Sequence, residues 1–331
     1  LDYLELSACL KADYVDYDPA FWHYPSSLHR LEEKLRLDVF WARQLARKVR
    51  MEKYDSVLSM SERIGIPLAY GLDRKVKHVV ILHHPISPAK LTMMKLLNIG
   101  KRWDALLALS QAEADFLRSN LKVEEERVGV LHSVVDTQFF RIAGISASGG
   151  QDDYVFSLGV TNRDYLTLIN ALRELPEIPC HISSTSAWVA ADKGLDAQRS
   201  LPANVLLKDY NHPEVIRDAY AGCRFVVIPL RAETTQWSAG STSLLQPQAM
   251  GKAVIATRIP GLTDYVVDGE TGILVEGNNS EAMAEAIRYL WEHPEIAAEM
   301  GRRGREWVSA HFSYEAWLKR VEQILEGDVI G

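Results

Sequence analysis

Short apolar runs of strand length alternate with amphipathic stretches of helix length along most of the 331 residues of this chain. This alternation predicts an α/β fold with parallel sheets covered by helices, because parallel neighbours need a helical crossover between them. A long helix is expected over 28–51. In the first half of the chain we expect strands over 14–17, 56–59, 78–82, 105–109 and 128–131. The first half therefore predicts one sheet domain.

A small, polar and glycine-rich stretch over 143–153 follows these strands and is typical of an interdomain linker. Strands and helices then alternate again, which predicts a second doubly wound sheet. The expected strands cover 154–158, 180–183, 205–207, 225–229 and 254–257. We therefore expect an N-terminal domain over 1–145, a C-terminal domain over 146–312, and a final helix over 313–331 that crosses back to the N-terminal domain.

The composition is that of an ordinary soluble globular protein, with 47% hydrophobic and 24% charged residues. A formal net charge of -7 gives no overall attraction for nucleic acid, so no nucleic-acid partner is expected. Cys9, Cys180 and Cys223 lack the paired spacing of a zinc site or a disulfide framework, which favours a cytoplasmic location. No apolar run is long enough to cross a bilayer.

A turn of small residues follows the strand over 225–229 and opens a helix at Gly240-Ser241-Thr242-Ser243. Backbone N–H groups at a helix N-terminus, together with the helix dipole, favour a phosphate. Gly240 permits a close approach of the ligand, and the three hydroxyls that follow it add donors. The alternative is a turn that only caps its own helix.

Several motifs of the second half follow the order of one known family. They are Pro229, the Gly240 turn, segments 249–257, 260–262 and 264–275, and helices over 280–291 and 300–308. In this order they resemble glycosyltransferase family 4, whose members have the GT-B fold. The first half is similar more loosely, at His83 and at segments 108–110 and 130–140. The family's first strand and glycine-rich loop are not found, and residues 1–10 read as a helix without an initiator Met, so we expect the natural chain to begin earlier.

The resemblance implies two Rossmann-like doubly wound domains that face a central cleft, with the donor nucleotide on the C-terminal domain. It implies retaining transfer of a hexose-like unit from a nucleotide sugar to a hydroxyl of a glycan, a lipid-linked acceptor or a small molecule. No metal or other cofactor is expected, because basic side chains and backbone donors stabilise the departing diphosphate in this fold.

The sequence departs from the family at the Glu-x7-Glu motif, which falls on Ser238 and Gln246. Gln246 keeps an acceptor oxygen for the ribose hydroxyls but carries no charge. Ser238 cannot replace a carboxylate near the donor sugar, although the turn of Gly240, Ser241 and Thr242 still offers backbone donors. The missing carboxylates favour another reading, a degenerate relative that binds a nucleotide or glycan without transfer. A nucleotide-sugar epimerase is a third reading, but it would need acidic and His groups in the cleft that the sequence does not show.

The family's diphosphate-binding Arg follows a strand that ends in Gly, but here the residue after Gly159 is not basic. Arg163 is the nearest cation, and Gly159 and Thr161 stand beside it in a loop-like segment. We expect Arg163 to steady the diphosphate, with Arg231 as a second candidate. The alternatives are a surface ion pair between Arg163 and Asp164 and a solvated Arg231.

His83 follows a buried strand, at the end where α/β proteins usually bind ligands, and matches the family's donor-site His. We expect it to hydrogen-bond the sugar, and a structural histidine is the alternative. The loop after the strand over 205–207 falls where the family contacts its nucleotide. In that loop Asp209 and Tyr210 are candidate contacts, and Tyr210 either stacks on the base or is a half-buried loop aromatic.

The segment Lys90–Trp103 mixes apolar residues with four cations, Lys90, Lys95, Lys101 and Arg102. Such a basic amphipathic segment is able to touch a membrane that carries a lipid-linked acceptor. An ordinary helix with a solvated basic face is the alternative. No His, Asp or Glu residues stand at a spacing typical of a metal site.

Overall fold

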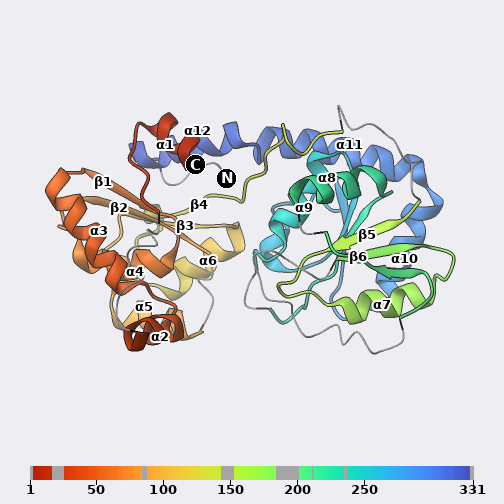
Figure 1. Ribbon diagram of the computed structural model, residues 1–331, viewed down its shortest axis with the longest axis horizontal. Coiled ribbons are helices and arrows are strands. Elements are labelled where there is room, and N and C mark those ends of the chain that lie inside the picture. The colour runs from red at the N-terminus through yellow and green to blue at the C-terminus, as the bar shows by residue number, and fades with distance from the viewer. Residues whose placement is uncertain are drawn as a thin grey trace. The chain divides into compact units, whose positions relative to one another are not determined.

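The computed structural model describes residues 3–16, 26–83, 88–142, 153–183, 201–210, 212–234 and 237–328. Its residues group into two compact units (Figure 1). The N-terminal unit contains Leu1–His132 and Leu318–Gly331, and the C-terminal unit contains Ser133–Trp317. Helix α12, Tyr314–Glu326, therefore contributes residues to both units.

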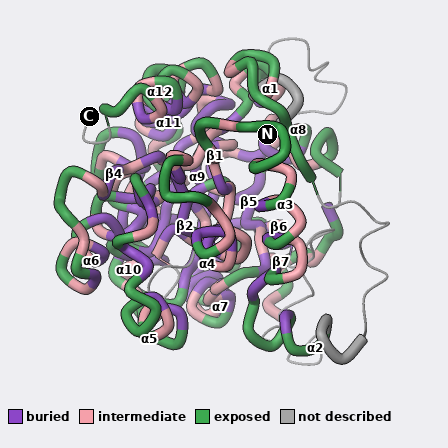
Figure 2. The backbone as a smooth tube through the Cα atoms, turned by 90° about the vertical axis from the view of Figure 1, so that its left-hand side faces the viewer, coloured by how far each residue is buried: buried purple, intermediate pink, exposed green. Residues whose placement is uncertain are grey.

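The N-terminal unit contains a four-stranded parallel sheet in the order β1-β2-β3-β4. Strands β2 and β3 are buried almost throughout. In Figure 2, where buried residues are purple, the label of β2 lies among purple segments. The strands are β1 (Ser56–Ser59), β2 (Lys77–Leu82), β3 (Ala105–Ala108) and β4 (Val128–Val130). Each begins and ends within one residue of a strand that the sequence predicts.

The helices of this unit lie between and around its strands (Figure 1). They are α1 (Tyr3–Leu10), α2 (Ser26–Leu35), α3 (Val39–Glu52), α4 (Glu62–Gly71), α5 (Pro88–Leu96) and α6 (Gln111–Asn120). Serine hydroxyls cap two of them: Ser61 accepts from the backbone N–H of Arg63 at the start of α4, and Ser110 accepts from Glu113 at the start of α6.

Two predictions for this unit are wrong. The single helix expected over 28–51 is divided into α2 and α3, because Arg36 adopts a left-handed conformation with φ 51° that ends α2. The strand expected over 14–17 is not formed at Tyr14–Asp16, the part that the structure describes. An extended segment becomes a strand only when a neighbour pairs with it, and none of the strands β1 to β4 does so.

The C-terminal unit contains a six-stranded parallel sheet in the order β10-β9-β8-β5-β6-β7. The chain enters at β5 in the middle, runs outward through β6 and β7, and then fills the other side from β8 to β10. The strands are β5 (Val155–Leu158), β6 (Cys180–Ser183), β7 (Val205–Leu207), β8 (Val226–Ile228), β9 (Val254–Thr257) and β10 (Gly272–Val275). The sequence predicts all of them except β10.

Both faces of this sheet are buried. Val226 and Ile228 join one apolar cluster, whereas Val227 between them joins a second cluster on the opposite face. The covering helices are α7 (Tyr165–Arg173), α8 (Pro213–Gly222), α9 (Ser241–Ala249), α10 (Ser280–Glu292) and α11 (Pro294–His311). Among the described helices of the chain, none is long and apolar enough to cross a membrane.

Candidate functional site

The candidate site lies where the strand order of the C-terminal unit reverses, between β5 and β8, a place where α/β proteins usually bind ligands. Gly159 follows β5, and Gly240 immediately precedes α9. Both have a positive φ, 115° and 93°, which glycine adopts without strain. A Cβ atom at Gly159 would lie 2.2 Å from Nη2 of Arg163, so the absence of a side chain makes room for that guanidinium.

The side chain of Arg163 connects the loop after β5 to the first turn of α9. Arg163 is only 6% exposed. Its Nε donates to the carbonyl of Leu158 at 2.9 Å, and its Nη1 donates to the carbonyl of Thr161 at 3.0 Å. Its Nη2 donates to Oγ of Ser243 at 2.8 Å. The guanidinium therefore holds the two glycine turns together.

The charge of Arg163 has no acidic partner within the described residues, since all three bonds go to neutral oxygens. The carboxylate of Asp164 instead accepts from the backbone and hydroxyl of Thr167 and caps α7, so the alternative of an Arg163–Asp164 ion pair is wrong. Burial lowers the pKa of Arg163, but a guanidinium stays protonated in proteins. A buried cation without a counter-charge is costly, so an anion bound beside it would be stabilised.

The first turn of α9 starts without a side-chain cap. The backbone N–H of Ser241 donates to the carbonyl of Ser238 at 3.2 Å, and Oγ of Ser241 lies 2.8 Å from Oγ of Ser133. Ser238 is 8% exposed, and its Oγ has no hydrogen-bond partner among the residues described. Thr242 is exposed. An uncapped helix N-terminus and an unused buried hydroxyl therefore meet at the Gly240 turn.

Arg231 and Gln246 lie on either side of this turn in the sequence. The backbone N–H of Arg231 donates to the carbonyl of Asn162 at 3.0 Å, which holds Arg231 beside the β5 loop with its side chain exposed.

Oε1 of Gln246 accepts from the hydroxyl of Tyr220 at 3.2 Å. One acceptor position of the Gln246 amide is therefore already used, and its second lone pair and two N–H groups remain for a ligand.

The structure places Tyr210 in the core of the C-terminal unit. The residue is 5% exposed, its ring packs edge-on against Phe156 at 5.0 Å, and its hydroxyl lies 3.2 Å from Nδ1 of His181. A ring so buried has almost no surface on which a nucleotide base can stack. Asp209, the preceding residue, is exposed.

His83 lies in the N-terminal unit directly after β2, with its side chain exposed. Its backbone N–H donates to Oε2 of Glu62 at 2.9 Å, and its ring Nε2 lies 2.9 Å from the carbonyl of Met60. A carbonyl only accepts, so Nε2 is the donor in this contact. His84 lies outside the described residues.

Glu62 and Lys90 form a buried ion pair beneath His83. Burial acts to raise the pKa of Glu62, but the charge and hydrogen bond of Lys90 and the N–H of His83 together hold that pKa below its ordinary value. Lys90 is 8% exposed and is therefore committed to this pair.

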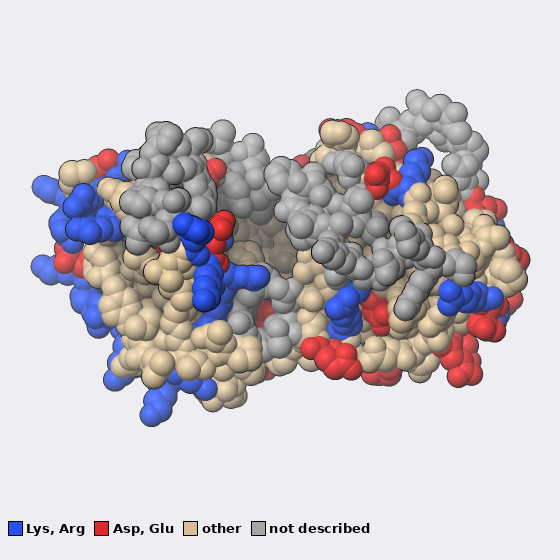
Figure 3. Space-filling view, turned by 60° about the horizontal axis from the view of Figure 1, so that its bottom comes forward, with Lys and Arg blue, Asp and Glu red and all other residues tan. Residues whose placement is uncertain are grey.

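The structure also corrects the reading of segment Lys90–Trp103. Both ends are buried, as are Met94 and Ile99, because the apolar side of the segment packs into the core of the N-terminal unit. The exposed residues of the segment include Lys95, Leu96, Leu97 and Lys101. Figure 3 shows that lysine and arginine side chains are spread over the surface of this unit. A membrane contact that includes Lys90 or Trp103 is inconsistent with their burial.

Some contacts of the site were not predicted from the sequence. Ser133 is 108 positions from Ser241 in the sequence, yet their hydroxyls are hydrogen-bonded to each other. The backbone N–H of Ser133 also donates to the hydroxyl of Tyr265 at 2.9 Å. No spacing rule predicts such a pair. Within the described ranges, no group of three or more His, Cys, Asp or Glu residues is arranged to hold a metal ion.

Comparisons with known proteins give matches over both units of the chain. Residues 144–307 match the family described as Glycosyl transferases group 1, and residues 9–139 match Glycosyltransferase Family 4. A D-inositol 3-phosphate glycosyltransferase from Arthrobacter sp. is 31% identical over 296 residues, which cover 81% of this chain and 69% of that protein. Two other curated relatives are longer, and the chain spans 28% of one and 56% of the other.

Solved structures show the same fold at low identity. A glycosyltransferase from Rickettsia africae superposes with a TM-score of 0.71 at 17% identity, covering 98% of this chain and 87% of that one. Anabaena HepE, solved in complex with UDP-glucose, superposes with a TM-score of 0.71 at 16% identity and covers 86% of this chain and 81% of its own. At such identities the likeness concerns the fold alone.

Proposed function

We propose that this chain, which belongs to glycosyltransferase family 4, transfers a sugar from a nucleotide-sugar donor to an acceptor hydroxyl. The proposed transfer retains the configuration of the sugar and needs no metal ion. The two parallel-sheet Rossmann-like units and the family match support a glycosyltransferase.

The observation that carries the proposal is the buried, uncompensated charge of Arg163 between the Gly159 and Gly240 turns. A diphosphate that lies over these turns would meet this charge, the uncapped N–H groups of α9 and the backbone around Thr161. Exposed Arg231 beside the same loop would add a second cation. These groups would stabilise the negative charge that develops on the leaving diphosphate.

The remaining donor contacts follow from the same turn. Ser238 Oγ, buried and without a partner in the described structure, would donate to the donor sugar. Gln246 would meet the ribose hydroxyls through the part of its amide that Tyr220 does not use. The UDP-glucose in the complex of Anabaena HepE supports a uridine nucleotide as the first donor to test.

A degenerate nucleotide-binding protein is the second candidate. Ser238 and Gln246 replace two carboxylates of the family pattern, and Gln246 already accepts from Tyr220. The two candidates differ in turnover, because a transferase releases UDP from UDP-sugar and a binding protein does not.

The test combines binding with turnover. Thermal unfolding is measured with UDP, GDP and TDP, since a ligand that binds only the folded protein raises Tm. Free nucleotide and anomeric configuration of the product are then measured with a panel of nucleotide sugars and a generic glycoside acceptor. A Tm rise with release of nucleotide supports transfer, whereas a Tm rise without release supports the binding protein. No Tm rise with any nucleoside diphosphate would overturn both.

A further inference from the structure

The hydroxyl of Tyr220 determines which end of the Gln246 side-chain amide faces a ligand. It donates to Oε1 of Gln246 at 3.2 Å, and among the described residues its proton has no other acceptor. Tyr220 is fully buried, and burial holds the pKa of its hydroxyl well above the ordinary value, so the hydroxyl stays protonated. An amide oxygen accepts whereas an amide NH₂ group only donates, so this buried proton is satisfied only when Oε1 turns toward Tyr220.

The core of the C-terminal unit holds the Tyr220 ring in place. Tyr220 lies in α8, and its ring packs edge-on against Phe140 and Phe156, with centroid distances of 6.3 and 5.6 Å. All three residues belong to one buried apolar cluster. The orientation of the Gln246 amide is therefore set by the fold and does not depend on a ligand.

The NH₂ group of Gln246 is the part of the amide that remains for a ligand. Among the described residues, Nε2 has no hydrogen-bond partner. Gln246 is half-buried in α9, the helix that follows the Gly240 turn. Oε1 carries no charge and is already shared with Tyr220, so it is a weak acceptor for a further hydroxyl. At this position the site therefore presents hydrogen-bond donors.

We infer that the site binds a nucleoside diphosphate without recognising its 2′-hydroxyl, an inference that rests on the proposed function. The donors of the reaction then include sugars carried on 2′-deoxynucleoside diphosphates. A carboxylate in place of Gln246 would accept from both ribose hydroxyls, whereas Nε2 donates to the oxygen of one. A site rejects an analogue that lacks a hydroxyl when one of its own polar groups is left unpaired. A 2′-deoxyribose keeps the 3′-hydroxyl, so Nε2 of Gln246 stays paired.

The test uses UDP and 2′-deoxyuridine diphosphate, which differ by one hydroxyl. Isothermal titration calorimetry measures both on the full chain, and the two dissociation constants of the wild-type protein are expected to agree within about threefold. Gln246→Glu restores an acceptor for both hydroxyls, so UDP should then bind more tightly than the deoxynucleotide by about tenfold or more. Tyr220→Phe keeps the ring and frees the amide to turn Oε1 toward the ligand, so the preference for UDP should rise there as well.

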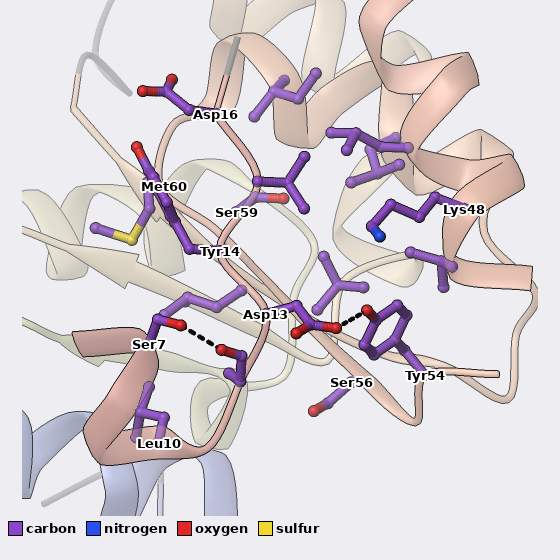
Figure 4. Close-up of a pocket in the computed structure, with 18 of the residues that line it drawn as sticks. Ser7, Leu10, Asp13, Tyr14, Asp16, Lys48, Tyr54, Ser56, Ser59 and Met60 are labelled. Carbon is purple, nitrogen blue, oxygen red and sulfur yellow. Dashed lines mark hydrogen bonds between the residues drawn. The ribbon is translucent and has the colours of Figure 1, made fainter. Parts of the chain in front are cut away.

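The control is a tyrosine hydroxyl in the N-terminal unit. Tyr54 borders a cavity of about 740 Å³ beside β1, and Figure 4 shows its hydroxyl bonded to the carboxylate of Asp13. Tyr54→Phe removes a hydroxyl of the same kind and is expected to leave the affinities for both nucleotides unchanged. Weaker binding in this variant would assign the nucleotide to that cavity and overturn the inference.

The remaining outcomes separate the inference from the proposed function. A wild-type preference for UDP of about tenfold or more overturns the inference and leaves the proposed function standing. An unchanged affinity ratio in Gln246→Glu does the same. If neither nucleotide binds, both fail. If Tyr220→Phe does not fold, Gln246→Ala takes its place and should weaken the two nucleotides equally, and an unequal loss contradicts the inference.

Discussion

Nη2 of Arg163 donates to Oγ of Ser243 at 2.8 Å and so joins the loop after β5 to the first turn of α9. Two glycine turns, one from each side of the strand-order reversal, are thereby fixed around one buried positive charge. A diphosphate site needs a backbone that the phosphates can approach closely, and it needs a positive charge. The contact between Arg163 and Ser243 holds both in one place.

The first prediction concerns Arg163 itself. Arg163→Met removes the charge, and we expect UDP affinity to fall by about 10- to 100-fold, or roughly 1.4 to 2.8 kcal/mol. Arg163→Lys keeps a charge but loses the planar fork, so an intermediate loss is expected. Isothermal titration calorimetry measures both, with Arg173→Met on the exposed part of α7 as the control. A folded Arg163→Met protein with wild-type affinity would remove Arg163 from the site.

The second prediction separates backbone strain from steric conflict. Gly159 and Gly269 both have positive φ, but a Cβ at Gly159 would collide with Arg163 whereas a Cβ at Gly269 meets nothing within 4 Å. Gly269→Ala should lower the free energy of unfolding by about 1 kcal/mol through strain alone. Gly159→Ala should lower it further and also weaken UDP binding, because the guanidinium must move. Urea unfolding and calorimetry check both, and equal effects of the two substitutions would contradict the steric argument.

The third prediction concerns the unused hydroxyl of Ser238. Removing a buried hydroxyl that has no partner costs little, so Ser238→Ala should change the free energy of unfolding by less than about 0.5 kcal/mol. We expect affinity for UDP to stay unchanged and affinity for the nucleotide sugar to fall. Ser241→Ala is the comparison, because its hydroxyl is bonded to Ser133 and its loss should destabilise the protein. A drop in UDP affinity for Ser238→Ala would assign this hydroxyl to the phosphates instead.

The fourth prediction is a pH dependence from His78, which is buried in β2 with Nε2 2.8 Å from Oγ of Ser59. Burial lowers the pKa of His78 to about 4, partly opposed by the charge of Asp104. The unfolded chain, with an ordinary histidine pKa near 6.5, binds the proton first as pH falls. Stability from this residue is therefore complete above about pH 6.5 and is lost progressively toward pH 4, by up to about 3 kcal/mol.

Urea unfolding at a series of pH values measures this effect. His78→Gln should flatten the stability profile between about pH 4 and 6.5. His311→Gln, on an exposed part of α11, should leave the profile as it is in the wild type. A wild-type profile that is flat over this range would contradict the assignment to His78.

Much of the fold could be predicted because its strands are buried on both faces. β3, β8, most of β9 and the last four residues of β2 read as apolar runs, and this pattern does not depend on long-range contacts. The break between α2 and α3 was missed because it rests on the left-handed backbone of Arg36, a residue type that gives no such signal. β10 was missed because its four residues are flanked by a turn-rich segment.

The candidate site was predicted less completely. A glycine marked each of the two turns, at Gly159 and at Gly240, because the side chain of Arg163 lies against both backbones. The burial of Tyr210 and Lys90 could not be read from the sequence, since it depends on Phe156 and Glu62, which are distant along the chain. When the partner of a polar residue is distant in the sequence, the residues next to it in the chain show no pattern that predicts the contact.

The N-terminal unit is assembled from both ends of the chain, since Leu318–Gly331 belong to it although Ser133–Trp317 form the other unit. Lys77 Nζ donates to the carbonyls of Ile324 and Leu325, at 3.3 and 2.7 Å. During translation, the ribosome must finish the whole C-terminal unit before these carbonyls exist. The C-terminal unit is synthesised second, yet it is the first unit whose residues are all available for folding. The N-terminal unit is complete only when the last helix has been synthesised.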